Sequence, residues 1–171
     1  MKNFPKSKLE GLLTFIVILL AILWRAPSIT FFLASPDHGY QLSLGTQVLH
    51  GKFPYVDLFF GYGPLVAFST TLGLWIHASL IPEILICGTS YALAIFLIYQ
   101  ITRSNTNRIL GWIASIIAYL FLTRFYKWYY WLFPLLSLYT YECFLLSNTL
   151  QQKKWIFITG LIGGCSWLFR F

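Results

Sequence analysis

Long apolar runs separated by short polar turns dominate this sequence. Five runs can be drawn as membrane-spanning helices, at about 9–33, 84–101, 109–123, 132–150 and 155–169. A sixth run, at 65–80, is close to the lower length limit for a spanning helix. Because the apolar residues are continuous rather than alternating, the pattern predicts helices rather than the strands of a membrane barrel.

One polar segment, SPDHGYQLSLGTQVLHGKFPYVDLFFGYGP at 35–64, directly follows the first apolar run. Ser35 and Pro36 are typical of a helix start, with serine as the N-cap and proline at the first helical position. Gly51 is typical of a helix end. The pattern predicts a helix lying in the membrane interface, followed by a loop that two prolines and two glycines shape.

Composition strengthens the membrane interpretation. The chain is 58% hydrophobic and 10% charged, whereas a soluble domain carries about 25% charged residues. We therefore predict an all-α, polytopic transmembrane helix bundle of about five spans. The net charge of +7 does not indicate nucleic-acid binding here, because the basic residues lie mostly in short loops between spans. Three cysteines, at 87, 143 and 165, lack metal-ligand spacing and are expected to be buried.

The distribution of charge decides how the chain is oriented. If 65–80 crosses the membrane, five Lys or Arg residues lie on each side; if it does not, seven lie inside and three outside. Only the second arrangement obeys the positive-inside rule. We therefore expect 65–80 to lie in the outer leaflet, 35–82 to form one outer-face segment, and the N-terminus to be cytoplasmic. The first run is long enough to be an uncleaved signal-anchor.

Both Asp residues of the chain, Asp37 and Asp57, lie in this outer segment. Asp37 is either a site residue or an acid that the helix macrodipole favours in the first turn. Asp57 is either a site residue or a turn residue of the loop. The same choice applies to His38 and Tyr62, whose alternatives are a solvated surface histidine and an interfacial aromatic.

Three basic residues, Arg124, Lys127 and Arg170, are placed at the outer face by the same topology. The first two lie in RFYKWYYW at 124–131, whose aromatic residues are typical of an interfacial belt. All three are candidates to face an anionic lipid headgroup, because guanidinium and ammonium groups bind phosphate well.

Two features within the spans carry structural expectations. Glu142 lies near the middle of the fourth span, where an ionisable group is costly, so it is expected to face the bundle interior as a hydrogen-bonded acid. The sequence does not decide whether its hydrogen-bond partner is Tyr139, Tyr141 or another group. Gly160 and Gly164 have GxxxG spacing in the fifth span, which predicts close helix packing.

Taken in order along the chain, these features resemble the GT-C superfamily of integral membrane glycosyltransferases. The shared features are the signal-anchor, an Asp at the start of an outer-face helix, the pattern "G…PY.D….YGP", and a membrane helix ending in a basic cytoplasmic loop. The chain looks most like the bacterial branch akin to protein O-mannosyltransferases and the lipid A aminoarabinose transferase. The run ITGLIGGCSWLFRF is similar to the family's Gly-rich fifth membrane helix.

The resemblance implies sugar transfer at the outer face of a bacterial plasma membrane. The donor would be a polyprenyl phosphate-linked sugar, and the acceptor a lipid, a glycan or a protein. Asp37 matches the family's first-loop Asp, which acts as a base toward the acceptor hydroxyl or positions it. Many relatives carry an acidic pair there, whereas His38 follows Asp37 here, and the use of a divalent metal stays open.

The other site residues follow from the same resemblance. Asp57 is the second catalytic candidate, and Arg124, Lys127 and Arg170 would stabilise the charge of the departing lipid phosphate. Relatives run several hundred residues. The 171 residues would therefore be the N-terminal part of a transferase domain, inactive alone.

A second hypothesis comes from a different class of protein: a non-catalytic membrane protein, such as a lipid-linked sugar translocase or an assembly subunit. A translocase is expected to carry polar residues along the inward faces of several spans, and only Glu142 lies clearly within a span. The concentration of polarity in the outer segment favours the enzyme.

Overall fold

The computed structural model describes residues 8–24, 36–59, 61–77, 79–121 and 127–170. These residues form seven helices: α1 (Lys8–Trp24), α3 (Pro36–Leu49), α4 (Pro64–Ile76), α5 (Leu80–Asn105), α6 (Arg108–Leu120), α7 (Tyr129–Leu146) and α8 (Thr149–Arg170). In this part of the chain, β-type pairing is limited to an isolated bridge between Pro54 and Leu58. The predicted all-α class is confirmed.

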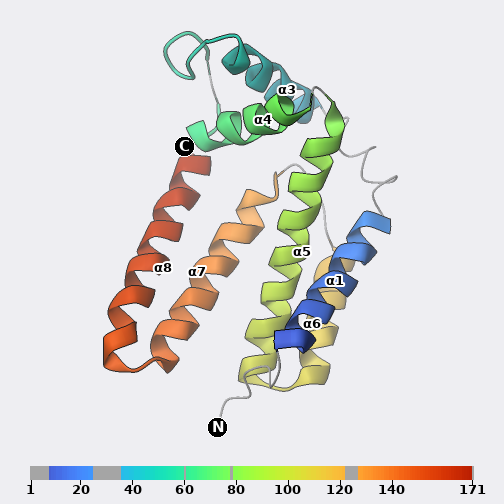
Figure 1. The fold of residues 1–171 in the computed structure, drawn as a ribbon, viewed down its shortest axis with the longest axis vertical. Coiled ribbons are helices and arrows are strands. Elements are labelled where there is room, and N and C mark those ends of the chain that lie inside the picture. Colours follow the sequence, from blue (N-terminus) through green and yellow to red (C-terminus); the bar gives the residue numbers. More distant parts are fainter. Residues whose placement is uncertain (1–7, 25–35, 60, 78, 122–126, 171) are drawn as a thin grey trace.

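Helix α5 runs through the middle of the bundle (Figure 1). Helices α1 and α6 pack on one side of α5, α7 packs on the other, and α8 packs beside α7. Helices α3 and α4 pack on each other and lie across one end of the bundle, where α4 contacts α5 and α8. We call α3, α4 and the loop between them the cap (36–59 and 61–76).

Local sequence signals set several helix ends. Ser79 Oγ accepts a hydrogen bond from the Ile81 amide at 3.3 Å at the start of α5, and Asn107 Oδ1 accepts one from the Leu110 amide at 3.0 Å at the start of α6. These bonds satisfy amides that the helix itself leaves unpaired. As predicted, α3 is followed by Gly51, whose φ of 84° lies in the left-handed region that glycine tolerates. Ser35, the predicted N-cap, lies outside the described residues.

The core is centred on α5. Cys87, Tyr91 and Tyr99 of α5 have no exposed surface. Helix α6 approaches α5 closely at Gly111, where a Cβ atom would lie 3.1 Å from the Tyr99 carbonyl oxygen. Glycine at this position therefore sets the short distance between the two backbones.

The apolar runs locate the helices but misplace some of their ends. The runs predicted at 132–150 and 155–169 correspond to α7 and α8, but α7 ends at Leu146 and α8 begins at Thr149. The predicted boundary is wrong because the first turns of α8 are the polar TLQQKK, which hydropathy assigns to a loop. Helix α5 likewise extends beyond the predicted 84–101 at both ends. The first run was predicted to reach residue 33, and its part beyond Trp24 lies outside the described residues.

One described helix, Ile81–Asn105, is both long and apolar enough to cross a membrane. Three shorter helices in the described part are also apolar: Leu9–Trp24, Pro64–Ile76 and Arg108–Leu120. Helix α4, which corresponds to the ambiguous run at 65–80, lies across the end of the bundle rather than alongside α5 (Figure 1). This orientation fits the non-spanning interpretation of that run, and the number of membrane spans stays a prediction.

Gly63, just before α4, joins the cap to the end of α8. Its amide donates a hydrogen bond to the Phe169 carbonyl at 3.3 Å. A Cβ atom at this position would overlap the carbonyl oxygen of Leu168 and lie 2.6 Å from the carbonyl carbon of Phe169. Only glycine fits here without movement of one of the two backbones.

We expect Gly63→Ala to destabilise the protein by about 1–3 kcal/mol, because overpacking against backbone cannot be relieved by a side-chain rotation. Gly61→Ala is the matched control, since a Cβ atom at Gly61 meets nothing within 4 Å. Thermal unfolding of the purified protein, followed by tryptophan fluorescence, measures both. Equal melting temperatures for the two variants would contradict a tight contact between the cap and α8.

Candidate functional site

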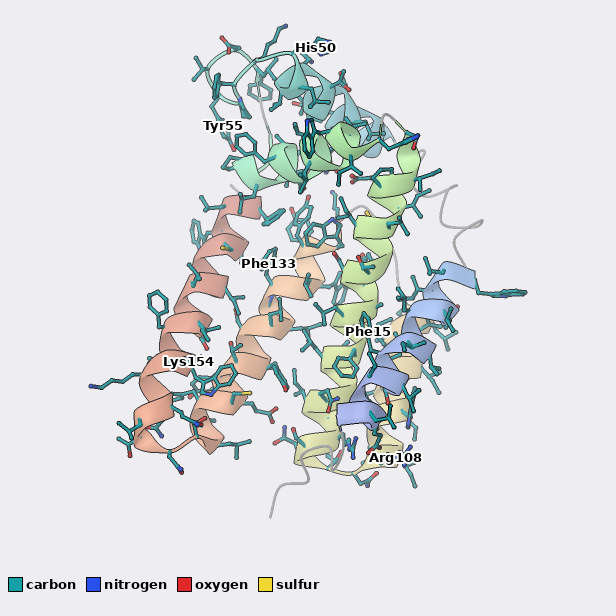
Figure 2. The ribbon with its side chains drawn as sticks, viewed as in Figure 1. Phe15, His50, Tyr55, Arg108, Phe133 and Lys154 are labelled. Atoms are coloured by element: carbon teal, nitrogen blue, oxygen red, sulfur yellow. The ribbon has the colours of Figure 1, made fainter. Side chains whose placement is uncertain are left out.

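Three of the candidate site residues predicted from the sequence lie at the end of the bundle that carries the cap. Asp57 and Tyr62 lie in the loop between α3 and α4, and Lys127 lies just before α7. Figure 2 shows His50 and Tyr55 at this end, and Arg108 and Lys154 at the opposite end.

Four of the predicted site residues are described only in part or not at all. Asp37 and His38 belong to the first turn of α3 and Arg170 is the last residue of α8, but their side chains lie outside the described part of the chain. Arg124 lies outside it entirely. The roles of these residues therefore stay predictions.

Asp57 closes a tight turn within the cap loop. Its Oδ2 accepts a hydrogen bond from the Phe53 amide at 2.8 Å, and its own amide donates to the Phe53 carbonyl at 2.9 Å. Tyr55, between them, has a φ of 67°, a conformation that is unusual for a residue with a side chain. The geometry matches the turn-residue alternative for Asp57, whose exposed carboxylate supports the loop.

Tyr62 lies at the centre of a group of aromatic rings with a cation beside it. The Tyr40 ring centroid lies 6.4 Å from that of Tyr62, and Lys127 Nζ lies 5.8 Å from the Tyr62 ring centroid. Tyr40 donates to the Phe59 carbonyl at 2.9 Å, and Tyr55 donates to the Tyr62 carbonyl. Burial raises the pKa of Tyr55, which keeps its phenol protonated as a donor. These contacts bring Tyr62 and Lys127 together, as two of the predicted site residues.

The aromatic segment predicted as an interfacial belt is divided between two environments. Trp128 and Tyr129 are buried against Phe169 of α8, with ring centroids 5.3 Å apart in both cases. Tyr130 and Trp131 are exposed. The belt prediction is wrong for Trp128 and Tyr129, because the end of α8 supplies an aromatic partner that composition alone cannot reveal.

At the end opposite the cap, an ion cluster joins three helices. Arg103 of α5 contacts both carboxylate oxygens of Glu10 in α1, at 3.2 and 3.3 Å. Arg108 Nε of α6 lies 3.6 Å from the same carboxylate. This cluster was not among the predicted sites, although the charge distribution that obeys the positive-inside rule puts the N-terminus and both arginines on the same side.

Glu142 is a hydrogen-bonded acid, as predicted, but its partners come from another helix. Ser104 Oγ donates to its carboxylate at 3.1 Å, and the Asn105 amide group also donates to it. Both partners lie at the end of α5, so Glu142 sits near the end of the bundle rather than at its middle.

Two smaller expectations have different outcomes. Cys87 and Cys143 are buried, as predicted, and Cys165 is partly buried. The close packing predicted at Gly160 and Gly164 is wrong within the described residues, because a Cβ atom at either position meets nothing within 4 Å.

Among the described residues, no group of three or more His, Cys, Asp or Glu side chains is arranged to hold a metal ion. No protein-family model, curated protein or solved structure matches this chain. The resemblance to GT-C glycosyltransferases therefore stays a prediction from sequence.

The bond between Asp57 and Phe53 predicts how two substitutions should differ. Asp57→Ala removes the acceptor of the Phe53 amide, and we expect that amide to exchange with solvent roughly fivefold faster, as for a lost hydrogen bond of about 1 kcal/mol. Asp57→Asn keeps an oxygen acceptor and should exchange nearly as slowly as the original protein. Hydrogen exchange read by mass spectrometry across 52–58 makes the comparison, and equal exchange in both variants would exclude a turn-closing role.

Proposed function

We propose that this chain is the N-terminal part of a membrane glycosyltransferase, which transfers a sugar from a polyprenyl phosphate-linked donor to an acceptor at the outer face of the membrane. One observation carries the proposal: the cap lies across one end of the bundle and gathers the candidate residues there. Tyr62 of the cap and Lys127, which precedes α7, come from separate segments of the sequence and lie 5.8 Å apart there, Asp57 lies in the same cap loop as Tyr62, and Asp37 belongs to the first turn of α3.

The charge distribution supports an outward-facing cap. Arg103, Arg108, Lys153 and Lys154 lie toward the opposite end, where Figure 2 labels Arg108 and Lys154, whereas Lys52 and Lys127 lie at the cap end. The positive-inside rule assigns that end to the cytoplasm. A donor sugar on a polyprenyl lipid would then approach the cap from the outer leaflet.

Lys127 and Tyr62 form a surface suited to a sugar phosphate. A lysine ammonium is a good point-charge partner for phosphate, and a tyrosine ring offers an apolar face next to it. The two groups lie 5.8 Å apart, so one ligand could contact both. Arg124 and Arg170, near Lys127 and Phe169 in sequence, are the additional candidates to hold the phosphate.

Asp37 is the proposed base. It belongs to the first turn of α3 and matches the first-loop Asp of the family that the sequence resembles. The acceptor oxygen would bond to the anomeric carbon as the bond from that carbon to the phosphate oxygen breaks. The hydroxyl proton passes to the Asp37 carboxylate, and the phosphate leaves with its lipid while nearby cations stabilise its charge.

The non-catalytic alternative receives less support. In the described helices of the bundle, Glu10, Arg103, Arg108 and Glu142 lie near the end away from the cap, and the buried Glu83 lies at the cap end beside Gly73 of α4. A translocation path would instead require polar groups spaced along the bundle.

The topology can be tested independently of any activity. Lys52→Cys, in the cap loop, and Lys153→Cys, in the first turns of α8, are made singly in a background with Cys87, Cys143 and Cys165 replaced by serine. The two cysteines should react with a membrane-impermeant thiol reagent from opposite sides of the membrane. We expect intact cells to label only the first and opened cells to label both. Labelling of both positions in intact cells would contradict the proposed orientation.

The proposed base is tested by Asp37→Asn in the full-length protein, assayed for sugar transfer from a polyprenyl phosphate-linked donor. We expect the rate to fall by about 10²–10⁴-fold, the usual contribution of a positioned general base. Lys52→Gln, an exposed residue of the cap loop with no proposed role in transfer, is the control and should retain most of the activity. Undiminished transfer by correctly inserted Asp37→Asn protein would exclude the base assignment.

A further inference from the structure

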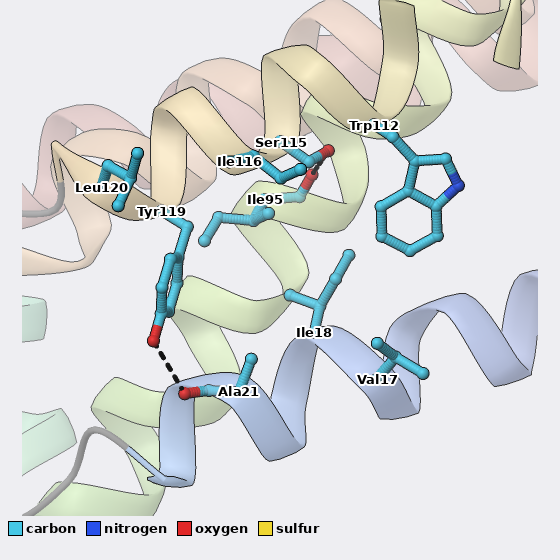
Figure 3. Close-up of a pocket in the computed structure, with 9 residues that line it drawn as sticks. All are labelled: Val17, Ile18, Ala21, Ile95, Trp112, Ser115, Ile116, Tyr119 and Leu120. Atoms are coloured by element: carbon cyan, nitrogen blue, oxygen red, sulfur yellow. Dashed lines mark hydrogen bonds between the residues drawn. The ribbon is translucent and has the colours of Figure 1, made fainter. Parts of the chain in front are cut away.

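A groove with an entirely apolar lining lies between α1 and α6, with α5 as its floor (Figure 3). Its pocket has a volume of about 370 Å³. Val17 and Ile18 of α1 face Trp112 and Ile116 of α6 across it, and Ile95 of α5 lies beneath. Val17 and Ile116 are 55% and 54% exposed, so the groove is open on its outer side.

Polar contacts hold the two walls of the groove together at both ends. At the end nearer the cap, the Tyr119 hydroxyl of α6 donates to the Ala21 carbonyl of α1 at 3.1 Å (Figure 3). At the other end, Arg108 Nε lies 3.6 Å from Glu10 Oε1. Because α1 and α6 contact each other at both ends of the groove, the opening between these two contacts is a fixed part of the structure.

A second pocket of about 330 Å³ continues the groove toward these charges. It shares Val17 and Trp112 with the first pocket and reaches Glu10 and Arg108. The combined groove follows α6, whose 13 residues correspond to about 20 Å of helix. That length is close to one leaflet of a bilayer with its headgroups, since both leaflets together with their headgroup regions are about 40–45 Å thick.

The charged end of the groove has an excess of positive charge. Arg103 is largely buried and contacts both oxygens of Glu10, so this pair is neutral as a unit. Arg108 adds a further positive charge, and its side chain is 64% exposed. A guanidinium has five N–H donors, so contact with one Glu10 oxygen leaves donors available to an anion.

We propose that the groove binds one anionic phospholipid of the leaflet opposite the cap. An acyl chain lies between α1 and α6, and the headgroup phosphate binds Arg108. A helix from another protein would fill an apolar groove equally well, but it would not need a cation at one end at the depth of the headgroups. The combination of an apolar groove one leaflet long and a terminal exposed arginine favours a lipid. The proposal requires the bundle to lie in a membrane, but it does not depend on sugar transfer.

Trp112 lines both pockets and therefore reports directly on the occupant. The full chain is placed in phosphatidylcholine vesicles in which a minor share of the lipid carries bromine on its acyl chains, either as phosphatidylglycerol or as phosphatidylcholine. The Trp112 signal is the fluorescence difference between the original protein and Trp112→Phe. We expect the effective quenching of this signal to be about fivefold stronger with the anionic lipid, the preference typical of one Arg near a membrane surface.

Two variants identify the headgroup contact. Arg108→Gln should abolish the preference for the anionic lipid, while Lys153→Gln, an exposed basic residue outside the groove, should leave it unchanged. Equal quenching by both lipids in the original protein would overturn the proposal without any variant. A preference that survives Arg108→Gln would also overturn it, as would the absence of quenching by either lipid, which would mean that protein fills the groove. If any of these contradicting results is obtained while sugar transfer is unchanged, the lipid-binding proposal fails and the proposed glycosyltransferase function still stands.

Discussion

Helix α5 is surrounded by other helices, and this burial determines where the rest of the described structure lies. Helices α1, α6 and α7 pack along its sides, and α4 crosses near its start, where Gly73 lies close to Ile86. In a hydrocarbon environment the backbone must satisfy its own hydrogen bonds, so a long helix is the natural central element. Helices α3 and α8 then form an outer layer, since α3 packs on α4 and α8 packs on α7 and α4.

The sequence predicts the helices well because both a protein core and a lipid environment require apolar side chains. It predicts their ends less well because hydropathy reports burial, whereas a helix ends where backbone hydrogen bonding stops. Thr149 begins α8 in a polar stretch for this reason. Pairings across the bundle are harder still: Glu142 and Ser104 lie on different helices, and only the fold brings them within 3.1 Å.

The candidate site shows the same division between what a pattern can and cannot predict. Charge asymmetry was enough to place Asp57, Tyr62 and Lys127 at one end. The local use of Asp57 was not predictable, because it depends on the backbone of Phe53 turning back toward the carboxylate at 2.8 Å. The aromatic segment before α7 gave no sign of which rings point inward, since Trp128 acquires its buried environment only when Phe169 arrives from the end of α8.

Basic side chains have different partners at the two ends of the bundle, and this difference links the two proposals. At the end away from the cap, Arg103 is held by the Glu10 carboxylate, which neutralises it for any external anion. At the cap end, Lys127 lies over the Tyr62 ring, and a ring quadrupole attracts a cation without cancelling its formal charge. Arg108 is intermediate, because its Nε lies 3.6 Å from Glu10 Oε1, farther than Arg103 does, and its side chain is exposed. A phosphate near the exposed Arg108 side chain would therefore meet a cation that the Glu10 carboxylate compensates only in part.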